Sequence, residues 1–199
     1  MAHGIPLAER KSPLRGAIDV LAGAYPAFVW GGAVGRLLPV FHFHEVTPES
    51  LEPYLLYLVR NGYGTVTSDA VARWIHDGIH PGNRKVVLCF DDAWASVWTV
   101  AAPLLKRHGL QGIAFAIPGR VRDAERVRPT MADPAGAPPD VDRSAEPFAT
   151  WPELRALHAG GVIDVQAHTY AHAVVFCDPT IVDFIGPGYA PHPHARPCV

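Results

Sequence analysis

A run of five apolar residues, Val86-Val87-Leu88-Cys89-Phe90, is followed at once by two aspartates. The run contains no polar side chain, which predicts a strand that is covered on both faces. Strands of this kind belong to parallel sheets with helices packed against them, so the run favours an α/β fold. It also places Asp91 and Asp92 just beyond the end of a buried strand, where the sites of α/β folds gather.

The segments around this run alternate between strand-like and helix-like patterns. The expected strands are residues 37–44, 63–67, 84–90, 112–117 and 162–167. The expected helices lie between them and begin near Thr47, Ser68, Val97 and Thr150. This order predicts parallel strands that are joined by right-handed crossovers. Residues 120–149 break the alternation, and we expect them to form a long surface loop.

The composition limits the classes of function. Hydrophobic residues make up 49% and charged residues 18% of the 199-residue chain, which predicts a sizeable core rather than disorder. The formal net charge of -2 gives no bulk attraction to phosphate backbones, so we expect no nucleic-acid partner. The three cysteines are scattered at positions 89, 177 and 198, and no disulfide framework can be inferred from them.

The two ends of the chain differ from its centre. We expect residues 1–36 to form an apolar, helical N-terminal segment and residues 179–199, with five prolines, to form a Pro-rich tail. The N-terminal segment resembles a signal peptide, but Asp19 and Pro26 interrupt its apolar stretch. A membrane span needs ~20 predominantly apolar residues, so we expect no transmembrane helix. The expected location is the cytoplasm, with export to the cell envelope as the alternative.

Two short motifs carry the chemistry. The adjacent carboxylates of Asp91 and Asp92 point to different sides of an extended backbone, so one can bind a metal while the other stays free. The motif His168-Thr169-Tyr170-Ala171-His172 follows another expected strand, and two histidines four residues apart can converge on one metal ion. Taken singly, each motif has an ordinary explanation, namely a solvated turn or a chance pair among 11 histidines. Together they provide one carboxylate and two imidazoles, a known catalytic zinc set, and a second carboxylate that could accept a proton from water.

In this order the motifs resemble those of the polysaccharide deacetylases with the NodB homology domain, carbohydrate esterase family 4. Phe90-Asp91-Asp92-Ala93 resembles the first family motif, and the histidine motif resembles the second. The supporting matches are Phe43-His44-Glu45-Val46, Asn61-Gly62-Tyr63 and the segment from Trp151-Pro152-Glu153-Leu154 to Gly161. The resemblance covers roughly residues 37–172.

The resemblance implies an incomplete, distorted (β/α) barrel of the NodB type over residues 37–178. It also implies an enzyme that hydrolyses N- or O-acetyl groups on an acetylated oligo- or polysaccharide, with Asp91 as the catalytic base. The implied ligands of a divalent metal, with zinc expected, are Asp92, His168 and His172. His44 matches a family histidine that lies near the site; the alternative for it is a hydrogen-bonded core histidine.

The sequence also departs from the family pattern. Ala93 stands where the family usually has glycine. Three later family features have no match: an arginine that steadies the base, an aromatic/acid motif, and a Leu-x-x-His whose histidine acts as the acid.

The second hypothesis is therefore an inactive or truncated remnant that binds a metal or a glycan. A glycosidase is the weaker reading, because adjacent Asp91 and Asp92 cannot readily flank one bond. The oligomeric state is left open.

Overall fold

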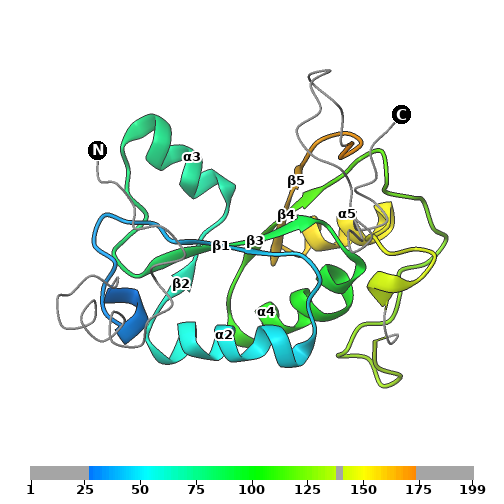
Figure 1. Cartoon of the computed structure of the whole chain (residues 1–199), viewed down its shortest axis with the longest axis horizontal. Helices are drawn as coiled ribbons and strands as arrows, with labels where there is room; N and C mark the ends of the chain where they lie inside the picture. The colour runs from blue at the N-terminus through cyan, green and yellow to red at the C-terminus, as the bar shows by residue number, and fades with distance from the viewer. Residues whose placement is uncertain (1–26, 138–140, 174–199) are drawn as a thin grey trace, which may run out of the picture.

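The computed structural model describes residues 27–137 and 141–173, which form a parallel sheet with helices on both faces (Figure 1). The sheet has the strand order β1-β3-β4-β5, and β2 also pairs with β3. The strands are β1 (Val40–Phe43), β2 (Gly64–Thr65), β3 (Lys85–Asp92), β4 (Gly112–Ala116) and β5 (Ile163–Ala167). The α-helices are α2 (Pro48–Arg60), α3 (Ser68–Asp77), α4 (Ala102–His108) and α5 (Trp151–Ala159). A π-helical stretch, Val97–Ala101, leads into α4, and short 3-10 turns occupy Ala27–Trp30 and Val141–Arg143.

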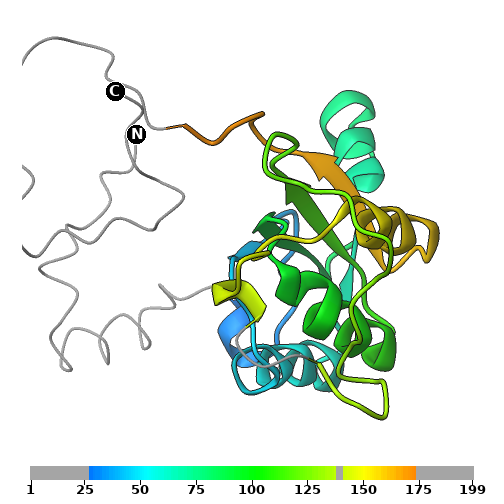
Figure 2. The same ribbon diagram turned by 90° about the vertical axis from the view of Figure 1, so that its right-hand side faces the viewer.

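The sheet is covered unequally on its two faces. Helices α2 and α4 lie along one face and α3 lies on the other, as the two views in Figures 1 and 2 agree. The large core cluster lies on the α2/α4 face and contains Leu51, Leu88, Phe90, Leu104 and Leu105, all nearly inaccessible to solvent. The opposite face carries a small cluster of Val66, Val87, Cys89 and Ile113. Burying each large apolar side chain contributes ~1.5–3 kcal/mol, so the α2/α4 face provides most of the stability.

Helix α2 begins where the sequence predicts. The side chain of Thr47 accepts a hydrogen bond from Ser50 N, and Ser50 Oγ accepts one from Thr47 N, which closes a capping box. The apolar residues of the helix, Leu51, Tyr54, Leu55, Leu58 and Val59, follow one helical stripe, of which only the centre is buried. Leu51, Leu55 and Leu58 are buried, whereas Tyr54 and Val59 at the edges of the stripe are 60% and 43% exposed.

Helix α3 is capped by a residue that lies far away in the sequence. Ser68, near which the sequence predicts the start of this helix, is its first residue, and Thr67 occupies the cap position without a side-chain hydrogen bond. Asp164 on β5 accepts hydrogen bonds from the backbone N–H and the hydroxyl of Ser68. Because this acceptor comes from a strand 96 residues later, local sequence could not reveal it.

The long segment 120–149 is not simply a surface loop, which corrects the sequence-based expectation. Phe148 is buried and its ring packs 4.9 Å from that of Trp94. Ala95 N donates to the carbonyl of Pro147, and Ala149 N donates to the carbonyl of Ala93, both at 2.8–2.9 Å. The segment therefore braces the loop that follows β3.

Arg128 and Glu153 anchor this segment to α5. Arg128 Nε and Nη2 donate to the two carboxylate oxygens of Glu153 at 2.9 and 2.6 Å, and the Glu153 side chain is inaccessible to solvent. Glu153 also accepts a hydrogen bond from the backbone N–H of Thr150, the residue that precedes α5. Burial opposes ionisation of Glu153, but the hydrogen bonds from Arg128 and from the backbone outweigh it and hold the pKa of Glu153 below its ordinary value.

The described sheet is open, with β1 and β5 at its edges, in agreement with the predicted incomplete barrel. Of the predicted N-terminal segment 1–36, residues 1–26 lie outside the described residues, as do the tail at 179–199 and residues 174–178 of the predicted domain. Within residues 27–137 and 141–173, each helix is too short or too polar to cross a bilayer.

We predict that Glu153→Gln destabilises the fold by ~3–5 kcal/mol at neutral pH, because it leaves the half-buried Arg128 charge without its partner. Since the folded-state pKa of Glu153 is lowered, its contribution is complete above the ordinary value of 4.5 and is lost as the pH falls through the folded pKa. Urea denaturation at pH 7 and at about pH 3 measures both effects. Glu125→Gln, at an exposed position, is the control. Equal stabilities of Glu153→Gln and wild type at pH 7 would contradict this prediction.

Candidate metal centre

The parallel register brings the two sequence motifs to the same end of the sheet. Asp92 lies opposite Ala116 on β4, and Ala116 lies opposite Ala167 on β5. His168 follows Ala167 directly, and its backbone N–H donates to the carbonyl of Ala116 at 2.7 Å. Two motifs separated by 76 residues in sequence therefore meet across one intervening strand.

Asp92, His168 and His172 form a group that can hold a metal ion. One ligand atom from each lies within 4.8 Å of the others. Asp92 Oδ1 is 3.7 Å from His168 Nε2 and 3.8 Å from His172 Nε2. A tetrahedral zinc ion with bonds of about 2.0–2.1 Å separates its ligand atoms by roughly 3.4 Å, so a small inward movement would complete the site.

The buried oxygen of Asp92 supports this fit. Asp92 Oδ1 is inaccessible and has no hydrogen-bond partner within the described part of the chain, because both imidazoles lie beyond hydrogen-bond distance. A buried carboxylate oxygen without a partner is costly, and a cation removes that cost. One carboxylate and two imidazoles are also a donor set that zinc accepts.

Backbone strain is concentrated at this group. Within the described ranges, the non-glycine residues with positive φ are Asp92 (66°), Ala93 (50°) and His172 (49°). Two of the three belong to the candidate metal group, and Ala93 holds the turn where the resembled family usually has glycine. Each such residue costs roughly 1–3 kcal/mol and persists only where its surroundings fix it, which is typical of functional sites.

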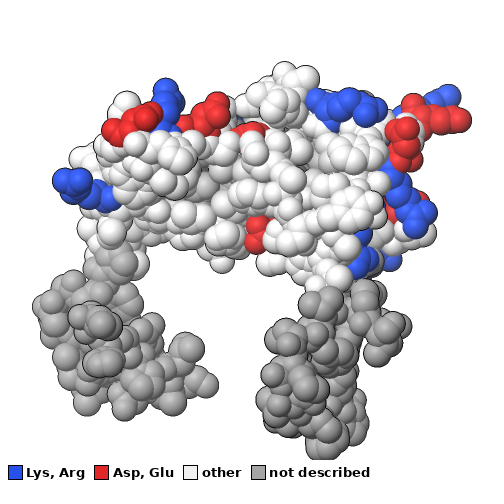
Figure 3. All heavy atoms as spheres, turned by 90° about the horizontal axis from the view of Figure 1, so that it is seen from above, with Lys and Arg blue, Asp and Glu red and all other residues white. Residues whose placement is uncertain are grey.

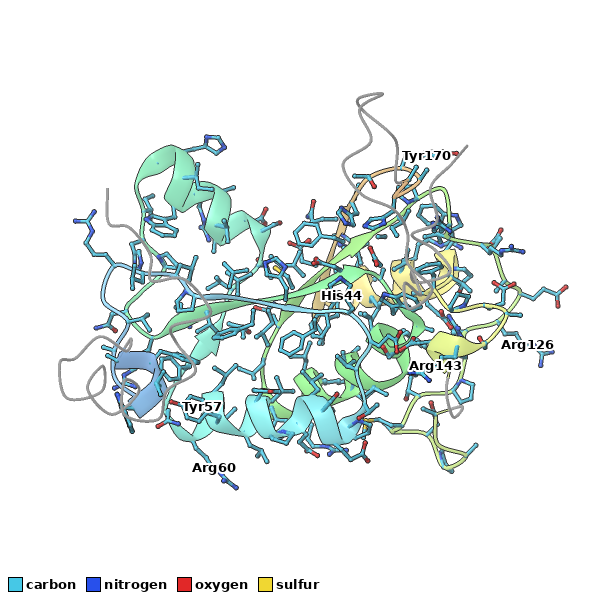
Figure 4. The ribbon with its side chains drawn as sticks, viewed as in Figure 1. His44, Tyr57, Arg60, Arg126, Arg143 and Tyr170 are labelled. Carbon is cyan, nitrogen blue, oxygen red and sulfur yellow. The ribbon has the colours of Figure 1, made fainter. Side chains whose placement is uncertain are left out.

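The turn that carries His168 and His172 is held in place by hydrogen bonds to its backbone atoms. Thr169 Oγ1 accepts from His172 N at 3.0 Å, Gly119 N donates to the carbonyl of Tyr170 at 2.8 Å, and Arg120 Nε donates to the carbonyl of Ala171 at 3.1 Å. The Tyr170 side chain is 76% exposed at the tip of this turn (Figure 4). The turn is thus tied to the loop after β4, and this fixes the spacing of the two imidazoles.

Asp91, the predicted base, lies beside this group but is not one of its members. It directly precedes Asp92 on β3. Asp91 Oδ2 lies 3.2 Å from Nδ1 of His42, and its side chain is 21% exposed. The sequence analysis missed His42. The signal that could have found it is the His-x-His spacing of His42 and His44, which predicts one face of a strand.

His44 directly follows β1 at the same end of the sheet as Asp91 (Figure 4). Its side chain is exposed, so the alternative of a hydrogen-bonded core histidine is wrong for the described structure. Among the described residues it forms no hydrogen bond or ion pair with Asp91 or with the metal group. A role for His44 in lining the site stays a prediction.

Cys89 does not belong to this chemistry. It lies on β3 two residues before Asp91 and is buried. Burial, assisted by the charge of Asp91, raises the pKa of the Cys89 thiol to about 11. The thiol therefore stays protonated at neutral pH and is neither a nucleophile nor a metal ligand.

A separate cavity of about 470 Å³ is lined by residues that follow β1, by residues that follow β3 and by part of the segment 120–149. Glu45, Ser96, Thr99 and Asp142 are among its lining residues, and the metal group is not. Burial raises the pKa of Asp142 despite the hydrogen bonds from Ser96.

The face shown in Figure 3 carries charges of both signs at its margins rather than a basic band, as the small net charge predicts.

Comparisons with known proteins converge on one family. A family model described as Polysaccharide deacetylase matches residues 78–180, just over half of the chain. Poly-beta-1,6-N-acetyl-D-glucosamine N-deacetylase of Escherichia coli (strain K12) is 30% identical over 129 residues, which cover 64% of this chain and 18% of that protein. YxkH of Bacillus subtilis (strain 168), named as a polysaccharide deacetylase, is 25% identical over 122 residues, which cover 57% of this chain and 44% of that protein.

Among solved structures, IcaB from Ammonifex degensii is similar with a TM-score of 0.51 and 25% identity, over 70% of this chain and 56% of that chain. The match supports the α/β architecture described above. The chain spans less than half the length of the two curated relatives that it matches.

We predict that His168→Ala and His172→Ala each lose most of the zinc that the wild-type protein retains, because each removes one of three ligands from a site with little to replace it. Elemental analysis after dialysis against zinc-containing and then zinc-free buffer measures the retained metal. His76→Ala, at an exposed position on α3, is the matched control. Retention equal to wild type in both site variants would show that the metal group is assigned wrongly.

We also predict that Gly119→Ala weakens zinc binding without altering a ligand. A Cβ at Gly119 would lie 2.6 Å from the carbonyl oxygen of Tyr170, so the histidine turn must shift. Supporting contacts around a metal site are typically worth roughly 10-fold to 100-fold in affinity. Isothermal titration with zinc measures the change, and the unfolding midpoint of the zinc-free variant checks that it is folded. Unchanged affinity in a folded variant would contradict the role of this contact.

Proposed function

The chain belongs to the polysaccharide deacetylase family, and on that premise we propose that it is a metal-dependent hydrolase that removes acetyl groups from a carbohydrate. The observation that carries the proposal is the group of Asp92, His168 and His172 with Asp91 adjoining it at one end of the sheet. It combines a metal site with a carboxylate that is left outside that site. This is the minimum that hydrolysis of an acetyl group requires.

Zinc is the metal that we propose for this group, held by Asp92, His168 and His172. When bound, it supplies a Lewis acid that polarises the acetyl carbonyl and stabilises the negative charge that develops on its oxygen. Two imidazoles and one carboxylate leave room for further ligands, as in catalytic rather than structural zinc sites. The half-exposed histidines keep that open side accessible from solvent.

Asp91 is the proposed general base. A water molecule adds to the acetyl carbonyl carbon, and Asp91 accepts the proton that this water loses. Collapse of the resulting adduct breaks the bond to the sugar nitrogen or oxygen, which takes up the proton that Asp91 accepted, and acetate is released. Asp91 suits this role because it lies next to a metal ligand without belonging to the ligand group, and one of its two oxygens is left without a partner among the described residues.

We propose an acetylated oligo- or polysaccharide as the substrate. The name of the Escherichia coli relative identifies a poly-beta-1,6-N-acetyl-D-glucosamine N-deacetylase, which makes an N-acetylated amino sugar the first candidate for this chain. His44, at the end of β1, is the proposed lining residue of the substrate site (Figure 4).

The second candidate function is a remnant that binds a metal or a glycan without turnover. It is favoured because, among the described residues, the hydrogen-bond and ion-pair partner of Asp91 is His42 and not an arginine.

We predict that Asp91→Asn retains zinc while acetate release falls by roughly 100-fold to 10,000-fold, because asparagine keeps the shape of the side chain but removes its basicity. The assay is acetate release from β-1,6-linked N-acetylglucosamine oligomers by the zinc-loaded chain. Asp77→Asn, at an exposed position at the end of α3, is the matched control. Equal and substantial rates for wild type and Asp91→Asn would remove Asp91 from the mechanism. Zinc binding by wild type without acetate release would favour the second candidate.

A further inference from the structure

A general base needs a fixed orientation as well as a basic group. A carboxylate can rotate about its side-chain bonds, and only some of its orientations aim a lone pair at the attacking water. Asp91 is partly exposed, so packing alone does not restrict this rotation. A hydrogen-bond donor on a rigid element can do so, in the same way that catalytic bases elsewhere are oriented by a third group.

We propose that His42 is a positioning residue that holds the carboxylate of Asp91 in its working orientation, an inference that rests on the proposed function of Asp91 as the base. His42 Nδ1 lies 3.2 Å from Asp91 Oδ2, within hydrogen-bond distance. With the proton on Nδ1, the imidazole donates to Oδ2 and leaves Oδ1 of Asp91 to accept the proton from water.

The sheet fixes the geometry of this pair. His42 lies opposite Cys89 in the parallel register of β1 and β3, and Asp91 is two residues beyond Cys89 on the same face of β3. Both partners therefore stand on paired strands rather than on loops. Sites on such elements are held more precisely than sites on loops.

The contact acts through orientation more than through charge. The His42 side chain is 57% exposed, and ion pairs at exposed positions contribute little in water. One hydrogen bond to one oxygen nevertheless selects a carboxylate rotamer. His42 therefore influences the rate through Asp91 and does not itself contact the substrate.

The described residues contain no competing partner for Asp91. His42 is the one side chain in residues 27–137 and 141–173 that hydrogen-bonds to it. Arg128, an arginine of the long segment after β4, is occupied instead by Glu153 and by the carbonyls of Glu146 and Phe148. Within the described ranges, His42 is therefore the side chain placed to orient the carboxylate of Asp91.

Two substitutions separate a positioning role from a merely structural one. His42→Leu removes the donor, whereas His42→Asn keeps an N–H near the place of Nδ1. With zinc-loaded full-length chain, we expect His42→Leu to lower kcat for acetate release by roughly 10-fold to 100-fold, with KM and bound zinc unchanged. His42→Asn should recover most of this loss, and the exposed control His76→Leu should match wild type. Equal kcat for wild type and His42→Leu, or no recovery in His42→Asn, would overturn the proposal.

A second measurement does not depend on activity. In the ¹⁵N-histidine NMR spectrum of the full chain, the His42 ring signals are identified by their loss in His42→Asn. Asp91→Ala should shift the His42 Nδ1 signal, because it removes the acceptor, and should leave the His76 signals in place. An unchanged His42 signal in Asp91→Ala would overturn the proposal even if the enzyme is active. A shifted signal in a protein that releases no acetate would support the contact and reject the proposed function instead.

Discussion

The parallel pairing of β3 with β4 and of β4 with β5 is the constraint on which the candidate site depends. It sets Asp92, Ala116 and Ala167 side by side, so that His168 emerges next to the buried carboxylate. A slip of one residue in either pairing would turn every side chain of the strand to the other face. The two faces of the apolar run before Asp91 oppose such a slip, because Leu88 and Phe90 fill the large cluster whereas Val87 and Cys89 fill the small one, and a slip would exchange them. The hydrophobic core therefore fixes the geometry of the metal group.

The site is also where the chain departs from relaxed backbone geometry. Asp92, Ala93 and His172 all have positive φ, and the hydrogen bonds that hold them come from elsewhere. The segment 120–149 braces the turn at Ala93, and the loop at Gly119 ties down the histidine turn. Ligands fixed in this way at two strand ends couple metal binding to folding, because an ion that binds only the folded chain stabilises it.

Much of this arrangement could be predicted from sequence, and the exceptions have physical causes. The five strands and the helix starts at Thr47 and Thr150 are local patterns, and their predictions are confirmed within the described residues. The capping of α3 by Asp164 and the Arg128–Glu153 pair were missed because they join residues far apart in sequence. His42 was overlooked for the same reason, since its partner lies 49 residues away on the next strand of the sheet. The residues of the metal group were found because two strand ends each carry a compact motif.

The central claim is that Asp92, His168 and His172 bind one zinc ion, and X-ray absorption spectroscopy of the zinc-loaded chain tests it most directly. We predict a first shell of nitrogen and oxygen atoms at about 2.0–2.1 Å, with the multiple-scattering signal of two imidazoles. His168→Ala should reduce that signal to one imidazole, and His76→Ala should leave it unchanged. A shell with sulfur at about 2.3 Å, or an imidazole signal that is insensitive to both His168→Ala and His172→Ala, would contradict the account.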